Sequence, residues 1–207
     1  MRHLLSIASA LLLACAVVPA HADTVTYFVT VNTSSQAGNG GYIDLELNAG
    51  SLGAQDITAT VNGFNGAVLN PGDPNNDAIG TTGSLPGPLS FDNQVPNDYF
   101  ENLTFGNQLN FLVTLSGDGV STSGASTSDS GTIFQLSFLD PSLSNFLFSS
   151  DPNGVTAEID VAADGTLSTA AQPGASVAAT PEPATWSLVG LAGVLGCVVL
   201  QRKRLSA

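Results

Sequence analysis

The middle of this 207-residue chain lacks four residue types altogether. Between residues 23 and 180 there is no lysine, arginine, histidine or cysteine. All residues of these types lie before or after that stretch: Arg2, His3, Cys15, His21, Cys197, Arg202, Lys203 and Arg204. Side-chain salt bridges, disulfides and catalysis by histidine or cysteine are therefore excluded within it. Apolar burial and hydrogen bonds must hold it together.

The same stretch carries sixteen aspartate and glutamate residues with no cationic side chain to balance them. Nucleic acids and anionic membrane surfaces would be repelled by such a domain, so neither is an expected partner. The acidity fits two interpretations. It keeps an exported protein soluble, or it binds divalent cations, which would also relieve the repulsion between the carboxylates.

Apolar and polar residues alternate with a period of two, which indicates half-buried antiparallel strands. In Thr24–Asn32 the valines and Tyr27 share one face, and in Gly41–Asn48 three aliphatic residues alternate with Asp44 and Glu46. Further strands are expected at Asp56–Asn62, Leu89–Asn93, Tyr99–Phe105, Gln108–Ser116, Thr132–Leu139, Asn145–Ser149, Val155–Val161 and Gly165–Ser168.

Turn-forming glycine, proline and asparagine residues separate these segments, and no internal stretch has apolar residues at helical spacing. The pattern predicts an all-β fold, an antiparallel sandwich or jelly-roll-like domain over residues 23–167. Asn70–Pro88 is expected to be a long loop. Residues 168–180 have the Ala-, Ser- and Thr-rich composition of a flexible linker.

One segment of the long loop resembles the start of a calcium-binding loop. Asp73, Asn75 and Asp77 supply oxygen ligands at alternate positions, but Ala78 and Ser84 stand where such a loop needs glycine and glutamate. A plain turn stabilised by Asp and Asn side chains is the alternative. No other cofactor is expected.

Residues that would support enzymatic activity are scarce. No serine lies in a Gly-x-Ser-x-Gly motif, and there is no histidine to activate one. Glu46, Glu101 and Glu158 are the glutamates expected to face outward from strands, where a glycoside hydrolase would need a carboxylate pair across a cleft. We expect no enzyme. Exposed tyrosines among Tyr27, Tyr42 and Tyr99 would instead suit a carbohydrate-binding face.

The front of the chain has the three parts of a secretory signal peptide over residues 1–22. A short basic start precedes the apolar segment Leu4–Val18, and Ala20 and Ala22 form the small-x-small site that signal peptidase cleaves. The alternative is an uncleaved anchor, which Pro19 and the alanine pair oppose. The chain is therefore expected to be exported.

The last twenty-seven residues, 181–207, form a second targeting pattern. Pro181, Glu182 and Pro183 are followed by seventeen uncharged residues, 184–200, and then by the basic cluster Arg202, Lys203 and Arg204. A helix over 184–200 would be roughly 25 Å long, close to the ~30 Å of a hydrocarbon core, with the basic cluster in the cytoplasm. A permanent single-span anchor is one interpretation of this tail.

The tail closely resembles the PEP-CTERM sorting signal of Gram-negative bacteria. That resemblance implies recognition by an exosortase, a membrane-embedded cysteine protease, and removal of the tail near Pro181–Pro183. It also implies transient anchoring in the inner membrane, delivery to the cell surface or extracellular space, and an association with exopolysaccharide. The body is similar to a group of PEP-CTERM proteins without assigned activity, through Val31–Ser35, Leu85–Gly87 before Phe91, and Asn97–Tyr99.

The sequence therefore predicts an exported, non-enzymatic surface or matrix protein. A module that binds exopolysaccharide is the first alternative, and a carboxylate-based hydrolase is the second.

Overall fold

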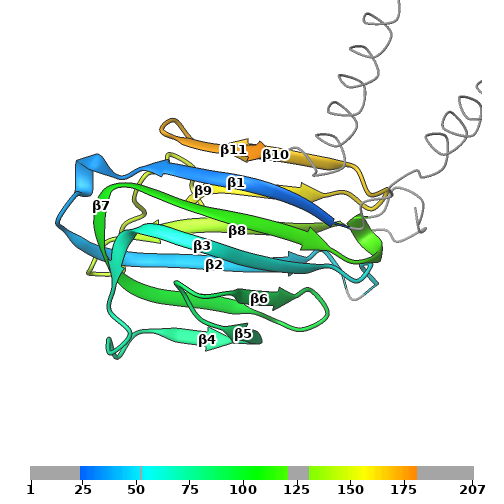
Figure 1. Ribbon diagram of the computed structural model, residues 1–207, viewed down its shortest axis with the longest axis horizontal. Helices are drawn as coiled ribbons and strands as arrows, with labels where there is room; N and C mark the ends of the chain where they lie inside the picture. Colours follow the sequence, from blue (N-terminus) through cyan, green and yellow to red (C-terminus); the bar gives the residue numbers. More distant parts are fainter. Residues whose placement is uncertain (1–23, 52, 121–130, 181–207) are drawn as a thin grey trace, which may run out of the picture. The chain divides into compact units, whose positions relative to one another are not determined.

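The computed structural model describes residues 24–51, 53–120 and 131–180, which belong to one compact unit, Asp23–Glu182. These residues form eleven strands and two 3₁₀ turns of three residues each, Ser34–Gln36 (η1) and Asp118–Val120 (η2) (Figure 1). The strands are β1 (Thr24–Asn32), β2 (Gly40–Ala49), β3 (Thr58–Leu69), β4 (Asp77–Ile79), β5 (Thr81–Gly83), β6 (Leu89–Asp92), β7 (Asp98–Ser116), β8 (Thr132–Leu139), β9 (Val155–Val161), β10 (Leu167–Ala171) and β11 (Ala175–Ala179). The all-β prediction is confirmed.

Every strand pairing is antiparallel, and the 19-residue strand β7 connects the two halves of the sheet. Its first half pairs with β2, in a chain of neighbours that runs β10-β9-β8-β2-β7. Its second half pairs with β1 along one edge, and β1 in turn pairs with β11. Along its other edge it pairs with β3, which is followed by β6 and β5. We call the strands β10, β9, β8, β2, the first half of β7 and β4 the β2 layer. The β1 layer comprises β11, β1, the second half of β7, β3, β6 and β5.

Two glycines allow β7 and β3 to bend together where the layers meet. Gly106 lies between the two halves of β7, and Gly66 lies in β3 beside register shifts in the pairing with β7. A Cβ on Gly66 would collide with the carbonyl oxygen of Gln108, and a Cβ on Gly106 would collide with the carbonyl oxygen of Gly66. Gly66 also has a φ of +97°, a backbone conformation that residues other than glycine rarely adopt. Glycine is therefore required at both positions.

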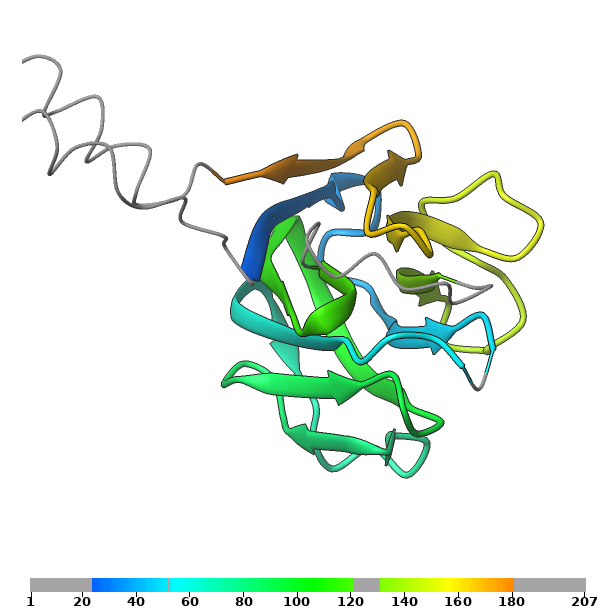
Figure 2. The same ribbon diagram turned by 90° about the vertical axis from the view of Figure 1, so that its right-hand side faces the viewer.

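The apolar faces predicted from alternation line one core between the layers. Ile43, Leu45 and Leu47 of β2 are fully buried, and so are the alternate apolar residues of the second half of β7. Phe91 of β6 meets Phe134 of β8 edge to face across the core, with ring centroids 5.9 Å apart. The strands of both layers wrap around this core, as the turned view shows (Figure 2). The arrangement is consistent with a sandwich.

The flexible linker predicted for residues 168–180 is wrong, because these residues form β10 and β11. β10 pairs with β9, and β11 pairs with β1 from Ala175↔Val31 to Ala179↔Tyr27. Backbone hydrogen bonds to β9 and β1 fix this segment in the sheet. Ala175 and Val177 also pack against the core.

Three other sequence predictions need correction. Asn145–Ser149 forms no strand and contributes one isolated bridge, between Phe146 and Leu139. The strands expected at 99–105 and 108–116 are one bent strand, β7, and the loop expected at 70–88 contains β4 and β5.

The described residues contain no helix long and apolar enough to cross a membrane. The expected signal peptide, 1–22, and the apolar run 184–200 lie outside them.

Candidate functional site

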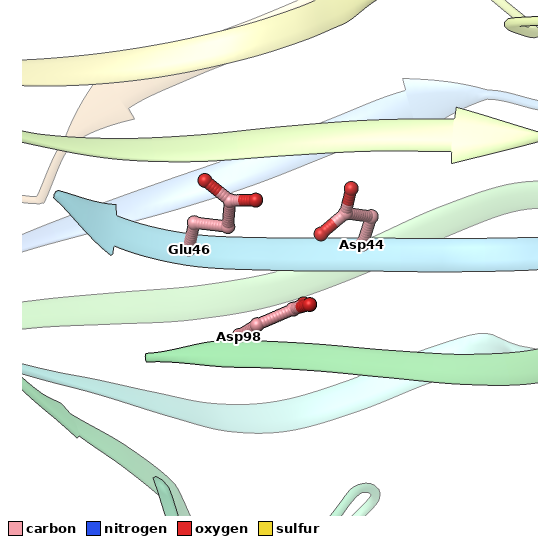
Figure 3. Close-up of side chains that lie close together, drawn as sticks. All are labelled: Asp44, Glu46 and Asp98. Carbon is pink, nitrogen blue, oxygen red and sulfur yellow. The ribbon is translucent and has the colours of Figure 1, made fainter. Parts of the chain in front are cut away.

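Three carboxylates gather on the outer face of the β2 layer (Figure 3). Asp44 and Glu46 occupy successive outward positions of β2, and Asp98 begins the neighbouring strand β7. Because Leu45 pairs with Tyr99, Asp98 lies beside the other two. One oxygen from each residue lies within 4.8 Å of the others, and each side chain is half-buried. We call this group the carboxylate triad.

Burial and mutual repulsion change the acidity of the triad. Burial, followed by the charges of Glu46 and Asp98, raises the pKa of Asp44 from 3.8 to about 7. The pKa of Asp98 is also raised, by burial and by the charges of Glu46 and Asp77, although its hydrogen bond with Asp44 opposes the rise. The Oδ1 atoms of Asp44 and Asp98 are buried and have no hydrogen-bond partner. Asp44 is therefore the member of the triad that holds a proton most readily near neutral pH.

The triad can do two things chemically. Its oxygens are the ligands that calcium prefers, and a divalent ion would replace the proton on Asp44 and remove the repulsion between the carboxylates. Alternatively, a carboxyl group with a raised pKa, Asp44, beside a second carboxyl group, Glu46, is the kind of pair that hydrolysis of a glycosidic bond uses. The sequence signal for the triad was the spacing of Asp44 and Glu46 on one strand face. No sequence signal identified Asp98 as their neighbour.

The calcium candidates Asp73, Asn75 and Asp77 lie in, and directly after, a turn of the kind given as the alternative interpretation. Asp73 Oδ1 accepts hydrogen bonds from the Asn75 backbone N–H at 2.9 Å and from the Tyr42 hydroxyl at 3.0 Å. Asn75 Nδ2 donates to the same hydroxyl at 2.9 Å. Asp77 lies in β4, where its Oδ1 accepts from the Ala78 N–H. The turn thus covers Tyr42.

A polar groove extends from the triad across the outer face of the β2 layer. A hollow of about 270 Å³ begins at Asp44 and Glu46 and is bounded by Gln135 of β8 and by Phe146 and Asn153 of the β8–β9 connection. A second hollow of about 260 Å³ shares Gln135 and Asn153 with the first and continues to Glu158 of β9 and Gln172. We call these two hollows the polar groove.

The polar groove offers amide and carboxylate groups beside one exposed aromatic ring. Phe146 is 44% exposed. Gln135 contributes an amide group and Glu158 a carboxylate to the lining of the groove. Such groups can bind the hydroxyls of a sugar while the ring contacts its apolar face.

Two expectations about ligand-binding residues are wrong. Tyr27, Tyr42 and Tyr99 are all buried, so none is an exposed platform for a sugar. Glu101 does not face outward but is only 5% exposed, on the inner face of β7, where it accepts a hydrogen bond from the Tyr99 hydroxyl. Glu46 and Glu158 do face outward.

The residues expected to direct export and sorting lie outside the described residues. They are Ala20, Ala22, Pro181, Glu182, Pro183, Arg202, Lys203 and Arg204. Comparison of the chain with protein-family models, characterised proteins and solved structures finds no match.

Proposed function

We propose that this chain is an exported, non-enzymatic protein of the cell surface or extracellular matrix, sorted and processed through its C-terminal signal. One observation carries the proposal: in the sequence, Pro181–Pro183, an uncharged run over 184–200 and the basic cluster Arg202–Arg204 follow one another. It is paired with the export signal over 1–22.

The end of the described domain supports a detachable tail. β11 ends at Ala179, and the backbone N–H and the hydroxyl of Thr180 both donate to the Thr26 carbonyl oxygen, at 2.8 and 3.0 Å. Pro181 follows directly. Cleavage near Pro181–Pro183 would therefore remove the tail without cutting a strand, and proline cannot donate the backbone hydrogen bond that would extend β11.

Mass spectrometry of the mature C-terminus tests the sorting proposal. We expect surface material to end near Pro181–Pro183. Glu182→Ala, or deletion of Arg202–Arg204, should leave a longer, membrane-bound species, whereas the control Ser206→Ala should be processed normally. Surface material that ends at Ala207 would mean that the tail is a permanent anchor.

The polar groove favours a second candidate function, binding of exopolysaccharide. The exported protein should be retained on the polysaccharide of its own cells, and Gln135→Ala or Phe146→Ala should weaken retention about tenfold. Phe28→Ala is a matched control, because Phe28 is 43% exposed on β1 of the other layer. Equal retention of all variants would contradict the groove as the binding site. Release of sugar that stops in Asp44→Asn would instead favour the hydrolase and contradict a non-enzymatic function.

A further inference from the structure

The outward side chains along the polar groove form a straight row that crosses the strands. Glu46 of β2 pairs with Gln135 of β8, Gln135 pairs with Glu158 of β9, and Glu158 pairs with Ala170 of β10. Residues directly opposite one another on neighbouring strands point to the same face of a sheet, so all four lie on the outer face. With neighbouring strands about 4.8 Å apart, the row is roughly 15 Å long, about the length of three sugar units. We call this row the groove floor.

The Phe146 ring stands beside the groove floor and packs against a glycine. A Cβ on Gly154 would collide with Cγ, Cδ1 and Cε1 of the ring, so the ring lies directly on the Gly154 backbone. The ring is nevertheless 44% exposed and lines the hollow that begins at Asp44 and Glu46. A ring that is packed against the backbone and yet nearly half exposed presents a fixed apolar surface to the groove.

The loop that carries Phe146 is held on both sides of the ring. Directly before Phe146, Asn145 Nδ2 donates a hydrogen bond of 2.7 Å to the Asp140 carboxylate. Two residues after Phe146, Phe148 has a φ of +58°, and its ring packs edge to face against Phe138 in the core. Backbone strain of this kind is costly and clusters at binding sites. Phe146 is therefore held in place before a ligand arrives, which reduces the entropy lost on binding.

We propose that the polar groove binds an internal segment of a straight, β-linked polysaccharide without acidic groups, with one sugar ring stacked on Phe146. This inference rests on the proposed binding of exopolysaccharide in the groove and names the class of chain. The Gln135 amide can donate to sugar hydroxyls and accept from them, and the carboxylates of Glu46 and Glu158 can accept. A pyranose with equatorial hydroxyls presents C–H groups above and below its ring, which suits an aromatic surface.

Shape and charge disfavour two other classes of chain. An α-linked glucan coils and would curve away from the straight groove floor, whereas a β-linked chain stays extended along it. A uronic acid polymer would place carboxylates beside Glu46 and Glu158, and residues 23–180 contain no cationic side chain to offset the repulsion. At one end the floor reaches the small, exposed side chains of Ala170 and Ala171, which leave room for the chain to continue.

Calorimetric titration of the exported protein in EDTA tests the class of chain. The probes are cellohexaose, which is β-linked and neutral, maltohexaose, which is α-linked and neutral, and hexagalacturonate, which is acidic. Cellohexaose should bind at least tenfold more tightly than either of the others, and more tightly than cellobiose, which is shorter than the groove floor. Absence of cellohexaose binding, or equal affinity for cellohexaose and maltohexaose, would overturn the proposal.

Variants of Phe146 assign the binding to the groove. Phe146→Ala should weaken cellohexaose binding about tenfold, and Phe146→Tyr, which keeps the ring, should retain it. Phe28→Ala removes an equally exposed ring from β1 of the other layer, so it is the matched control and should leave the affinity unchanged. Full affinity in Phe146→Ala, or an equal loss in Phe28→Ala, would contradict the assignment.

Gly154→Ala tests whether the position of the ring matters. Its Cβ would displace the Phe146 ring without removing a group that contacts the sugar, so binding should weaken severalfold. Adding the same substitution to Phe146→Ala should cause no further loss, because the ring through which it acts is already absent. A further loss in the double variant would contradict a positioning role for Gly154.

Retention of the protein on the exopolysaccharide of its own cells separates failure of this inference from failure of the proposed binding. Retention without cellohexaose binding would overturn the class of chain and leave the groove as a polysaccharide site. Loss of both would contradict polysaccharide binding itself.

Discussion

Replacing Asp44 with asparagine should remove a large part of the pH dependence of folding stability between pH 4 and pH 8. The pKa of this carboxyl rises on folding from 3.8 to about 7, with burial as the main cause. A group of this kind favours the folded state when protonated. Its contribution is complete below pH 3.8 and is lost as the pH rises through 7, so the protein should become less stable toward alkaline pH.

The magnitude follows from the difference between the two pKa values. At about 1.4 kcal/mol for each pH unit, the step from 3.8 to about 7 corresponds to about 4 kcal/mol as an upper limit. Asp44 is only half-buried, and solvent screening reduces the expected effect to roughly 2–3 kcal/mol. Asparagine keeps a donor for Asp98 without the charge. We therefore expect the variant to be more stable than the natural protein at pH 8 and equal to it at pH 4.

Urea denaturation followed by circular dichroism at pH 4, 6 and 8 measures this difference. Asp160→Asn is the control, because it removes one negative charge from the outer face of β9, away from the triad. Its effect should stay within about 0.5 kcal/mol at each pH. Parallel stability curves for Asp44→Asn and the natural protein would refute the reasoning. Equal gains from Asp160→Asn would mean that overall charge, and not the triad, sets the pH dependence.

Three further changes have defined outcomes. Asn97→Ala should lower the free energy of unfolding in urea by about 2–4 kcal/mol. The side chain of Asn97 accepts a buried hydrogen bond from the Leu47 N–H at 2.7 Å and donates one to the Leu47 carbonyl oxygen at 2.8 Å. An unchanged urea midpoint would contradict this prediction. Gly66→Ala should lower the free energy of unfolding by about 3 kcal/mol, because of the positive φ at this position and the collision with the Gln108 carbonyl oxygen. A melting temperature equal to that of the natural protein would contradict the requirement for glycine at this bend. Millimolar calcium at pH 8 should raise the melting temperature of the natural protein but not of Asp44→Asn, whereas indifference to both calcium and EDTA would remove the metal interpretation.

The sequence predicted those strands best that have one clearly apolar face. The limits expected for Thr24–Asn32, Thr132–Leu139 and Val155–Val161 are those of β1, β8 and β9. Alternation reports burial of one face, which these strands have. Residues 168–180 carry no such signal, because β10 and β11 lie at the margins of the sheet and depend on backbone hydrogen bonds with β9 and β1. β1 is distant from β11 in the sequence, and the pairing of β10 with β9 is defined only by the fold.

For the candidate sites, the sequence predicted only which residues of a single strand share a face. Asp44 and Glu46 face outward as the alternation of β2 predicts. Asp98 joins them through the register between β2 and β7, which a single sequence does not specify. The orientation of Glu101 was predicted wrongly because aromatic residues occupy both of the positions before it, Tyr99 and Phe100. Alternation then gives no preference for either face.

Charge of a single sign limits the polymers that this domain can bind. Every carboxylate that lines the polar groove would repel a uronic acid, and residues 23–180 contain no cationic side chain to attract one. Neutral sugars avoid that repulsion, and amino sugars gain from the charge. An acidic exopolysaccharide would need a divalent ion between its carboxylates and those of the carboxylate triad, so its binding should disappear with EDTA. Chitosan binding should instead survive EDTA and weaken with salt, because screening over about 10 Å at 0.1 M reduces the attraction of its ammonium groups. The two responses therefore separate a metal-bridged ligand from one bound by its own positive charge.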